Sequence, residues 1–184
     1  ATTGLGPDSF QRYLRAWMEC WLSWAIELFC DLFAAYVVGA AFAWAHLHLV
    51  ACVGDDPYRV PLMTRTVHPA DAARMTVLLL ALERLGFHDD RVNIETRWNS
   101  LLELIGAEVT PEYRRCFPDA LLSRIESLAF EGTATLRCSL AARDMKEPGR
   151  LLLNDAWKEF WRSPANYVGW EQRAVQQVVQ ALGG

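Results

Sequence analysis

The sequence predicts an all-α fold: an irregular helical bundle arranged around one long hydrophobic N-terminal helix. Apolar residues recur at helical spacing along most of the chain. Proline and glycine signals separate the helical segments, and no pair of segments has the alternating pattern of neighbouring strands. The chain has 184 residues, of which 52% are hydrophobic and 22% are charged, as is typical of a globular protein. We therefore expect a disordered lead over residues 1–7 and a single helical domain over residues 8–184.

Charge and cysteine content narrow the class of protein. The net charge is −4 and no more than two Lys or Arg residues are adjacent, which argues against a nucleic-acid partner. The five cysteines are odd in number and form no C-x-x-C pair, so neither a disulfide framework nor a zinc knuckle is predicted. This cysteine pattern indicates that the protein occupies a reducing compartment. We therefore expect a cytoplasmic protein, with membrane association as the alternative.

The first helix should begin near Phe10, after a cap at Asp8 or Ser9. Counting in sevens from Trp17 gives one inward face that holds three apolar residues and two carboxylates. These residues are Trp17, Cys20, Trp24, Glu27 and Asp31. We expect both carboxylates to be mostly buried beside Trp24 and Cys20.

An apolar run follows over residues 32–53, which contain no Asp, Glu, Lys or Arg. These 22 residues are long enough to cross a bilayer. His46 and His48, and the lack of a Lys/Arg cluster at either end, favour a core helix that is hydrophobic all round and bent near Gly39. A membrane span is the alternative.

The rest of the chain reads as shorter helices. A loop is expected over residues 54–67, and Pro69 should open the next helix, which Gly86 should end. Thr110–Pro111 and Phe117–Pro118–Asp119 mark two further helix starts. The helices expected after the loop cover residues 69–86, 91–107, 121–130, 135–145, 151–160 and 171–182.

Two short motifs carry the candidate chemistry. Glu27 and Asp31 form E-x-x-x-D, which places two carboxylates one helical turn apart. Like charges repel, and burial disfavours their ionised forms further, so the pair calls for a cation, a histidine or a metal. His68 to Arg74 forms H-P-x-x-x-x-R at the start of a helix. We expect Arg74 to approach Asp31 or Glu27 and relieve their repulsion.

In this order, with a hydrophobic helix between them, the motifs resemble the second half of the gluzincin zinc metallopeptidases that include the CAAX prenyl proteases and the heat-shock membrane proteases. Members carry H-E-x-x-H on one helix, E-x-x-x-D on a second, and then T-H-P-x-x-x-x-R-I. Here Thr66-Val67-His68-Pro69 and Arg74-Met75 stand in for the last stretch, with one inserted Val and with Met for Ile. The resemblance covers about residues 17–86, so residues 8–86 are the metallopeptidase-like part and residues 87–184 are additional helices.

The resemblance implies a role for each matching residue. Glu27 would be the third zinc ligand, and Asp31 would orient a zinc-bound histidine. Arg74 would organise the site, and His68 would shape the turn beside it. The substrate would be a peptide or protein.

The chain departs from this family because it has no H-E-x-x-H. None of its four histidines is paired with another at i, i+4. His46 lies 19 residues past Glu27, about 28 Å along a straight helix, so it reaches Glu27 only if the chain folds back near Gly39. Catalytic zinc needs three protein ligands and a base, so we expect zinc only together with an H-E-x-x-H segment or subunit.

Two hypotheses follow. In the first, the chain is the C-terminal, zinc-ligand-bearing part of a metallopeptidase and is not competent alone. In the second, it is a non-catalytic all-α interaction module, and an Arg or Lys of the chain satisfies its acidic pair. A nucleophilic hydrolase is a weaker third hypothesis, because no G-x-S-x-G is present.

Overall fold

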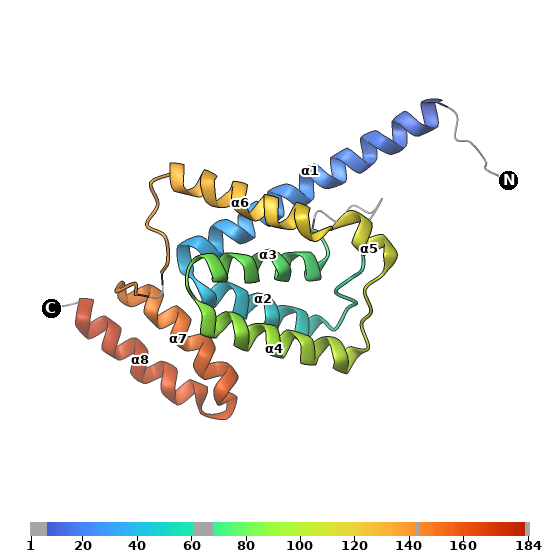
Figure 1. Cartoon of the computed structure of the whole chain (residues 1–184). Coiled ribbons are helices and arrows are strands. Elements are labelled where there is room, and N and C mark those ends of the chain that lie inside the picture. Colours follow the sequence, from blue (N-terminus) through green and yellow to red (C-terminus); the bar gives the residue numbers. More distant parts are fainter. Residues whose placement is uncertain (1–6, 61–67, 143, 183–184) are drawn as a thin grey trace.

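The computed structural model describes residues 7–60, 68–142 and 144–182, and it confirms the all-α prediction (Figure 1). Within these ranges the chain forms eight α-helices, one 3₁₀ helix and no strand. The α-helices are α1 (Pro7–Val38), α2 (Ala40–Val53), α3 (Asp71–Arg84), α4 (His88–Ile105), α5 (Pro111–Cys116), α6 (Asp119–Thr135), α7 (Pro148–Arg162) and α8 (Tyr167–Leu182). The 3₁₀ helix η1 covers Pro164–Asn166.

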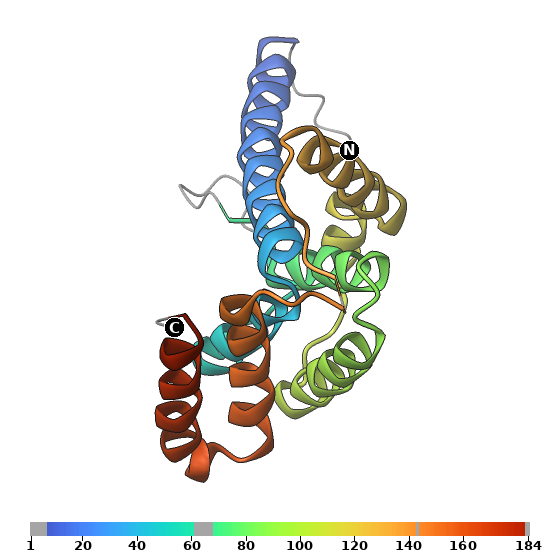
Figure 2. The same ribbon diagram turned by 90° about the vertical axis from the view of Figure 1, so that its left-hand side faces the viewer.

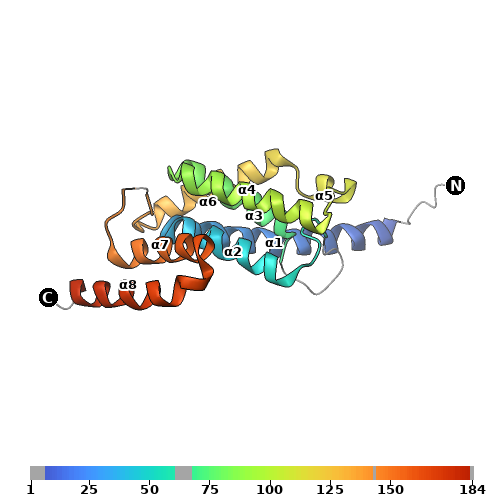
Figure 3. The ribbon, with the colours of Figure 1, turned by 90° about the horizontal axis from the view of Figure 1, so that it is seen from below.

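Helix α1 organises the molecule. Its C-terminal half packs on α3 and α6, and its apolar side chains there, including Trp24, Leu28 and Leu32, are fully buried. Its N-terminal half extends beyond the other helices, at the end of the molecule opposite to α7 and α8 (Figures 1 and 3). One helix therefore serves both as the centre of the core and as a projecting arm.

The apolar run over residues 32–53 is not one helix, which corrects the expectation of a single bent helix. Gly39 has φ +84°, a left-handed conformation that favours glycine, and it separates α1 from α2. The side chain of Asn154 in α7 bridges the break. Its Oδ1 accepts from the backbone N–H of Ala41 at 2.9 Å, and its Nδ2 donates to the carbonyl of Val38 at 2.7 Å. The Asn154 amide thus satisfies one backbone carbonyl and one backbone N–H that the break leaves without a helical partner.

The helix that satisfies the length and composition criteria for a membrane span is α1, over Ser9–Val38, and not the uncharged run 32–53. One third (33%) of the most apolar stretch of α1 is buried inside the protein. The same criteria are met by core helices of globular proteins. Packing accounts for the apolar side chains in the C-terminal half of α1 but not for the exposed apolar side chains of its N-terminal half.

Most start signals mark real helices, with shifted boundaries. The Thr110 side chain caps α5 by accepting from the Tyr113 N–H at 3.1 Å, and α6 begins at Asp119 as expected. Pro7, assigned to the disordered lead, is instead the first residue of α1. The helix expected over 135–145 is absent, because α6 ends at Thr135 and residues 136–142 form a turn and irregular structure. The lead residues 1–6 lie outside the described ranges.

The C-terminal helices form a pair at one end of the molecule. Helix α7 packs on α2 and contacts α1, whereas α8 packs only on α7 and η1 among the described elements (Figure 2). Among the described elements, only α7 therefore connects α8 to the core of the bundle.

Candidate functional site

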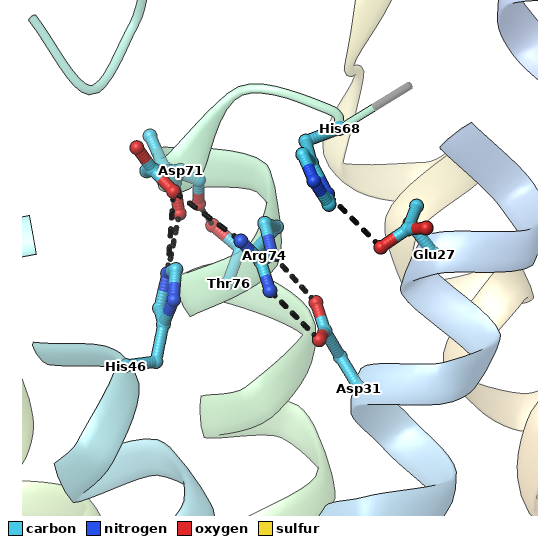
Figure 4. Close-up of polar contacts among 8 residues, drawn as sticks. Glu27, Asp31, His46, His68, Asp71, Arg74 and Thr76 are labelled. Atoms are coloured by element: carbon cyan, nitrogen blue, oxygen red, sulfur yellow. Dashed lines mark hydrogen bonds and ion pairs between the residues drawn. The ribbon is translucent and has the colours of Figure 1, made fainter. Parts of the chain in front are cut away.

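The two motifs meet, as predicted, where α3 begins against the middle of α1 (Figure 4). The Nε of Arg74 donates to Oδ2 of Asp31 at 2.7 Å, and its Nη2 donates to Oδ1 at 2.9 Å. The Asp31 side chain is 6% exposed and that of Arg74 is 14% exposed. This is a bidentate, largely buried ion pair, the geometry that gives the strongest charge-assisted hydrogen bonds.

A second carboxylate also holds the Arg74 guanidinium. Nη1 of Arg74 lies 3.6 Å from Oδ1 of Asp71, which is one turn earlier on α3. Burial alone would lower the pKa of Arg74, but the hydrogen bond and charge of Asp31, with the charges of Asp71 and Glu27, raise it above its ordinary value. Arg74 is therefore a permanent cation with a fixed orientation.

Glu27 has a different environment from Asp31. Its Oε2 lies 3.0 Å from Nδ1 of His68, and its side chain is 27% exposed, so Glu27 is mostly buried, as expected, but less completely than Asp31. The His68 side chain is 61% exposed. The two carboxylates therefore differ in their partners, because Asp31 pairs with the buried guanidinium of Arg74 while the partly exposed Glu27 pairs with the imidazole of His68.

The sequence reasoning missed His46 and Asp71. The chain turns back at Gly39, and α2 carries His46 to the start of α3, where its Nε2 lies 3.3 Å from the carbonyl oxygen of Asp71 and 3.9 Å from Oδ1 of Asp71. Burial, and then the positive charge of Arg74, lower the pKa of His46. His46 contacts Asp71 and not Glu27. The sequence did offer a signal for Asp71, because an acidic residue three positions before Arg74 lies next to it on the same helix face.

A small pocket of about 200 Å³ opens beside this cluster. It lies between the loop after α2 and the start of α3. The residues that line it are Asp55, Asp56, Arg59, His68, Pro69, Ala70, Asp71 and Arg74. The residues Thr66 and Val67, which carry part of the family resemblance, lie outside the described ranges.

The donor set of this chain alone does not fit catalytic zinc. Among the described residues, no group of three or more His, Cys, Asp or Glu side chains could hold a metal. The 3.0 Å between Oε2 of Glu27 and Nδ1 of His68 is the length of an ordinary hydrogen bond or ion pair.

Two other buried carboxylates are satisfied structurally. Glu126 on α6 accepts from Nε and Nη2 of Arg84 at 2.6 Å and from the Tyr36 hydroxyl at 2.9 Å. Asp90 on α4 pairs with Lys158 at 3.1 Å and accepts from the indole N–H of Trp44 at 3.1 Å. Because each has a cation and a neutral donor, neither carboxylate is left to bind a ligand.

Comparison with protein-family models, curated proteins and solved structures finds no match to this chain. What the chain itself presents is a fixed Asp31–Arg74 pair, a carboxylate and an imidazole at its edge, and a small polar pocket. Such an edge can contribute a ligand to a cation or hold a polar group of a substrate.

Proposed function

We propose that this chain is the C-terminal, zinc-ligand-bearing part of a metallopeptidase, which becomes competent only with a segment or subunit that carries H-E-x-x-H. One observation carries the proposal: Asp31 forms a buried bidentate pair with Arg74, while Glu27, one turn away, is partly exposed and pairs with His68, whose side chain is 61% exposed. A carboxylate that solvent reaches beside a buried ion pair is suited to bind a metal ion.

The interaction-module hypothesis explains Asp31 equally well, because it also requires an internal cation for the acidic pair. It also accounts for Glu27, which pairs with His68. What favours the metallopeptidase hypothesis is that the fold brings the residues of E-x-x-x-D and of H-P-x-x-x-x-R into contact with one another. The interaction module remains the second candidate, supported by the exposed apolar side chains along α1.

The roles in the complete site are those that the family resemblance implies. Glu27 would hold zinc together with two histidines of the H-E-x-x-H helix, and the bound zinc would supply the Lewis acid for peptide hydrolysis. Asp31 would orient one of those histidines through its N–H, as carboxylates next to metal sites do. Arg74 would hold the Asp31 carboxylate in place through its bidentate contact, and His68 would donate a hydrogen bond to a substrate carbonyl near Glu27.

We place this function in the cytoplasm, with membrane association through α1 as the alternative. All five cysteines are free thiols, and two of them, Cys30 and Cys52, are exposed, which suits a reducing compartment. The proposed partners are the H-E-x-x-H segment or subunit and a peptide or protein substrate, with no nucleic acid.

The test begins with a search for H-E-x-x-H in the gene that encodes the chain and in the neighbouring genes. The segment found is co-expressed with the chain, the complex is purified, and released zinc is measured with a chromogenic chelator. We expect one zinc per complex and cleavage of an unstructured protein such as casein. Glu27→Gln should abolish both, because it removes the charged ligand while keeping its size.

Two controls make this outcome specific. Glu112→Gln, an exposed carboxylate at the start of α5, should leave the zinc content unchanged. The isolated chain should bind zinc weakly or not at all. Tight stoichiometric zinc in the isolated chain would mean that other ligands exist. A complex without zinc, or one whose zinc survives Glu27→Gln, would support the interaction module instead.

A further inference from the structure

A groove between α4 and α7 takes no part in the candidate site. Helix α2 packs on both of these helices, and its Trp44 lines the groove that remains between them. The groove encloses about 760 Å³, a size that suits a small molecule. It shares no lining residue with the small pocket that Arg74 lines, so a ligand bound here is independent of the proposed function.

Charged side chains follow the same order on both walls of the groove. On α4, Asp89 precedes Arg97, and on α7, Asp155 precedes Arg162. The two members of each pair are about two helical turns apart, so each pair lies on one side of its helix. Each wall thus offers an acidic group first and a basic group two turns later.

Two contacts show that the walls run in the same direction. Near the start of α4, Oδ2 of Asp90 lies 3.1 Å from Nζ of Lys158. Further along both helices, the guanidinium carbon of Arg97 lies 5.2 Å from the centre of the Trp161 ring. The acidic side chains therefore lie toward one end of the groove, and the two arginines lie toward the other.

The charges at the two ends are available to a ligand, whereas Asp90 between them already has its two partners. The guanidinium of Arg97 lies over the rings of Trp44 and Trp161, at 6.0 and 5.2 Å from their centres, and forms no ion pair within the described part of the chain. Aromatic faces hold a guanidinium in place and leave the N–H groups at its edge free to bind an anion. At the acidic end, Asp155 has no ion pair among the described residues either.

We propose that this groove binds a short free peptide by both of its termini, with the peptide carboxylate at Arg97 and the peptide ammonium at Asp155. A guanidinium pairs with a carboxylate through two parallel hydrogen bonds. An ammonium group supplies the opposite charge that Asp155 lacks. The groove thus complements a ligand with one charge of each sign.

The separation of the two ends sets the length of the peptide. Asp155 lies six residues before Trp161, which contacts Arg97, and six residues span about 9 Å along α7. Three residues of extended chain span about 10 Å, so a tripeptide fits. Phe87 and Leu151 line the groove toward the acidic end, where they offer an apolar surface to the first side chain of the peptide.

Other ligands fit less well. A single amino acid carries both charges, but they are only one residue apart, so it reaches one end of the groove at a time. A simple anion would use Arg97 and leave the acidic end without a partner. A protein segment has neither terminus free, so it offers neither charge.

The test titrates the full chain with the tripeptide Leu-Gly-Gly and measures binding by isothermal titration calorimetry. We expect one site per chain with a Kd near or below about 1 mM, as is reasonable for a ligand of this size. N-acetyl-Leu-Gly-Gly and Leu-Gly-Gly amide should each bind at least about tenfold more weakly, because each lacks one of the two charges.

Two variants assign the ends of the peptide. Arg97→Gln should raise the Kd of Leu-Gly-Gly at least about tenfold and leave that of the amide unchanged, because the amide has no carboxylate to lose. Asp155→Asn should act in the same way on Leu-Gly-Gly and spare the N-acetyl peptide. Arg124→Gln, which changes an exposed arginine on α6, is the matched control and should leave all three Kd values unchanged.

Circular dichroism checks that each variant is folded. A folded natural chain that shows no saturable binding of Leu-Gly-Gly up to about 10 mM would overturn the proposal. Blocked peptides that bind as tightly as the free one would overturn it too, because the termini would then not be recognised. Neither result bears on Glu27, because this titration needs no zinc and no H-E-x-x-H segment.

Discussion

Arg74 is the residue on which the charge of the candidate site depends. Glu27, Asp31 and Asp71 surround this one guanidinium, so the cluster retains excess negative charge after Arg74 is counted. Asp31 has both of its oxygens in the bidentate contact. Solvent reaches the other two carboxylates, because the side chain of Glu27 is 27% exposed and that of Asp71 is 34% exposed. A cation that joins the site would be attracted to these two positions.

Replacing Arg74 by Leu should destabilise the protein by about 3–5 kcal/mol, because it leaves the buried Asp31 without its cation. Urea denaturation followed by tryptophan fluorescence measures this free energy of unfolding. Arg124→Leu, an exposed arginine on α6, is the control and should change it by less than about 0.5 kcal/mol. Equal effects of the two substitutions would show that the Asp31–Arg74 contact does not stabilise the fold.

His46 predicts how stability depends on pH. Burial and then Arg74 lower its pKa below the ordinary 6.5, so the unfolded chain binds this proton more readily than the folded one. The stabilisation is complete above pH 6.5 and is lost as the pH falls toward the depressed value. Each pH unit within that window should cost about 1.4 kcal/mol.

The measurement compares urea unfolding at pH 7.5 and pH 5 for the natural chain and for His46→Gln, which cannot titrate. We expect the natural chain to lose more stability between the two pH values than the variant does. Parallel losses in both proteins would mean that His46 is not the group responsible, and the remaining pH dependence would then belong to other residues.

The sequence allowed only part of this site to be predicted. The contact between Asp31 and Arg74 follows from local chemistry, because a buried carboxylate requires a cation and the H-P-x-x-x-x-R stretch offers one. The contact between His46 and Asp71 does not, since it depends on the path of the chain after Gly39. Whether Glu27 is exposed is likewise decided by how α3 packs on α1, which no spacing within one helix specifies.

At the scale of elements, the break between α1 and α2 decides which side chains reach the site. A straight continuation would carry His46 about 28 Å beyond Glu27. The left-handed Gly39 instead turns the chain, and Asn154 from α7 satisfies the free backbone groups of Val38 and Ala41. The turn at Gly39 thus brings α2 back beside α3, and with it His46 to the site.

Gly39→Ala should destabilise the protein by about 1–3 kcal/mol. A Cβ at this position would lie 3.0 Å from the Phe87 ring and 3.2 Å from Oδ1 of Asn154, in a backbone conformation that side chains rarely adopt. Gly132→Ala is the matched control. It lies inside α6, where the added Cβ meets only Phe29 at 3.7 Å, and it should stabilise the protein by about 0.5–1 kcal/mol.

Thermal unfolding of the two variants gives opposite shifts in Tm if this account is correct. A Gly39→Ala variant as stable as the natural chain would show that the break tolerates a side chain.

Element boundaries were predictable where a local signal fixes them. The capping Thr110 and the proline before Asp119 set two helix starts from neighbouring atoms alone. The helix expected over residues 135–145 does not form, because tertiary contacts of this segment outweigh its apolar helical pattern. The Ala141 N–H donates to the carbonyl of Tyr36 at 2.7 Å, so this segment is held as a strap across the C-terminal end of α1.

At the scale of the whole molecule, burial is unevenly distributed. The body built on α1, α3 and α6 contains fully buried side chains such as Trp24, Met75 and Leu122. In α8, no residue among 167–180, where burial is described, is fully buried, and α8 packs only on α7 and η1. The free energy of opening should therefore differ between the two ends of the chain.

Hydrogen exchange measured by mass spectrometry should resolve this difference. Peptides from α3 are expected to exchange only when the whole protein unfolds, because α3 packs against α1, α2, α4 and α6. Peptides from α8 should exchange by local detachment at least about a hundredfold faster, which corresponds to a difference of roughly 2.7 kcal/mol in opening free energy. Ending the chain at Arg162 should then leave exchange in α3 nearly unchanged. If that truncation exposed α3 to rapid exchange, α8 would be part of the cooperative core, and its weak packing on α7 would not describe its contribution to stability.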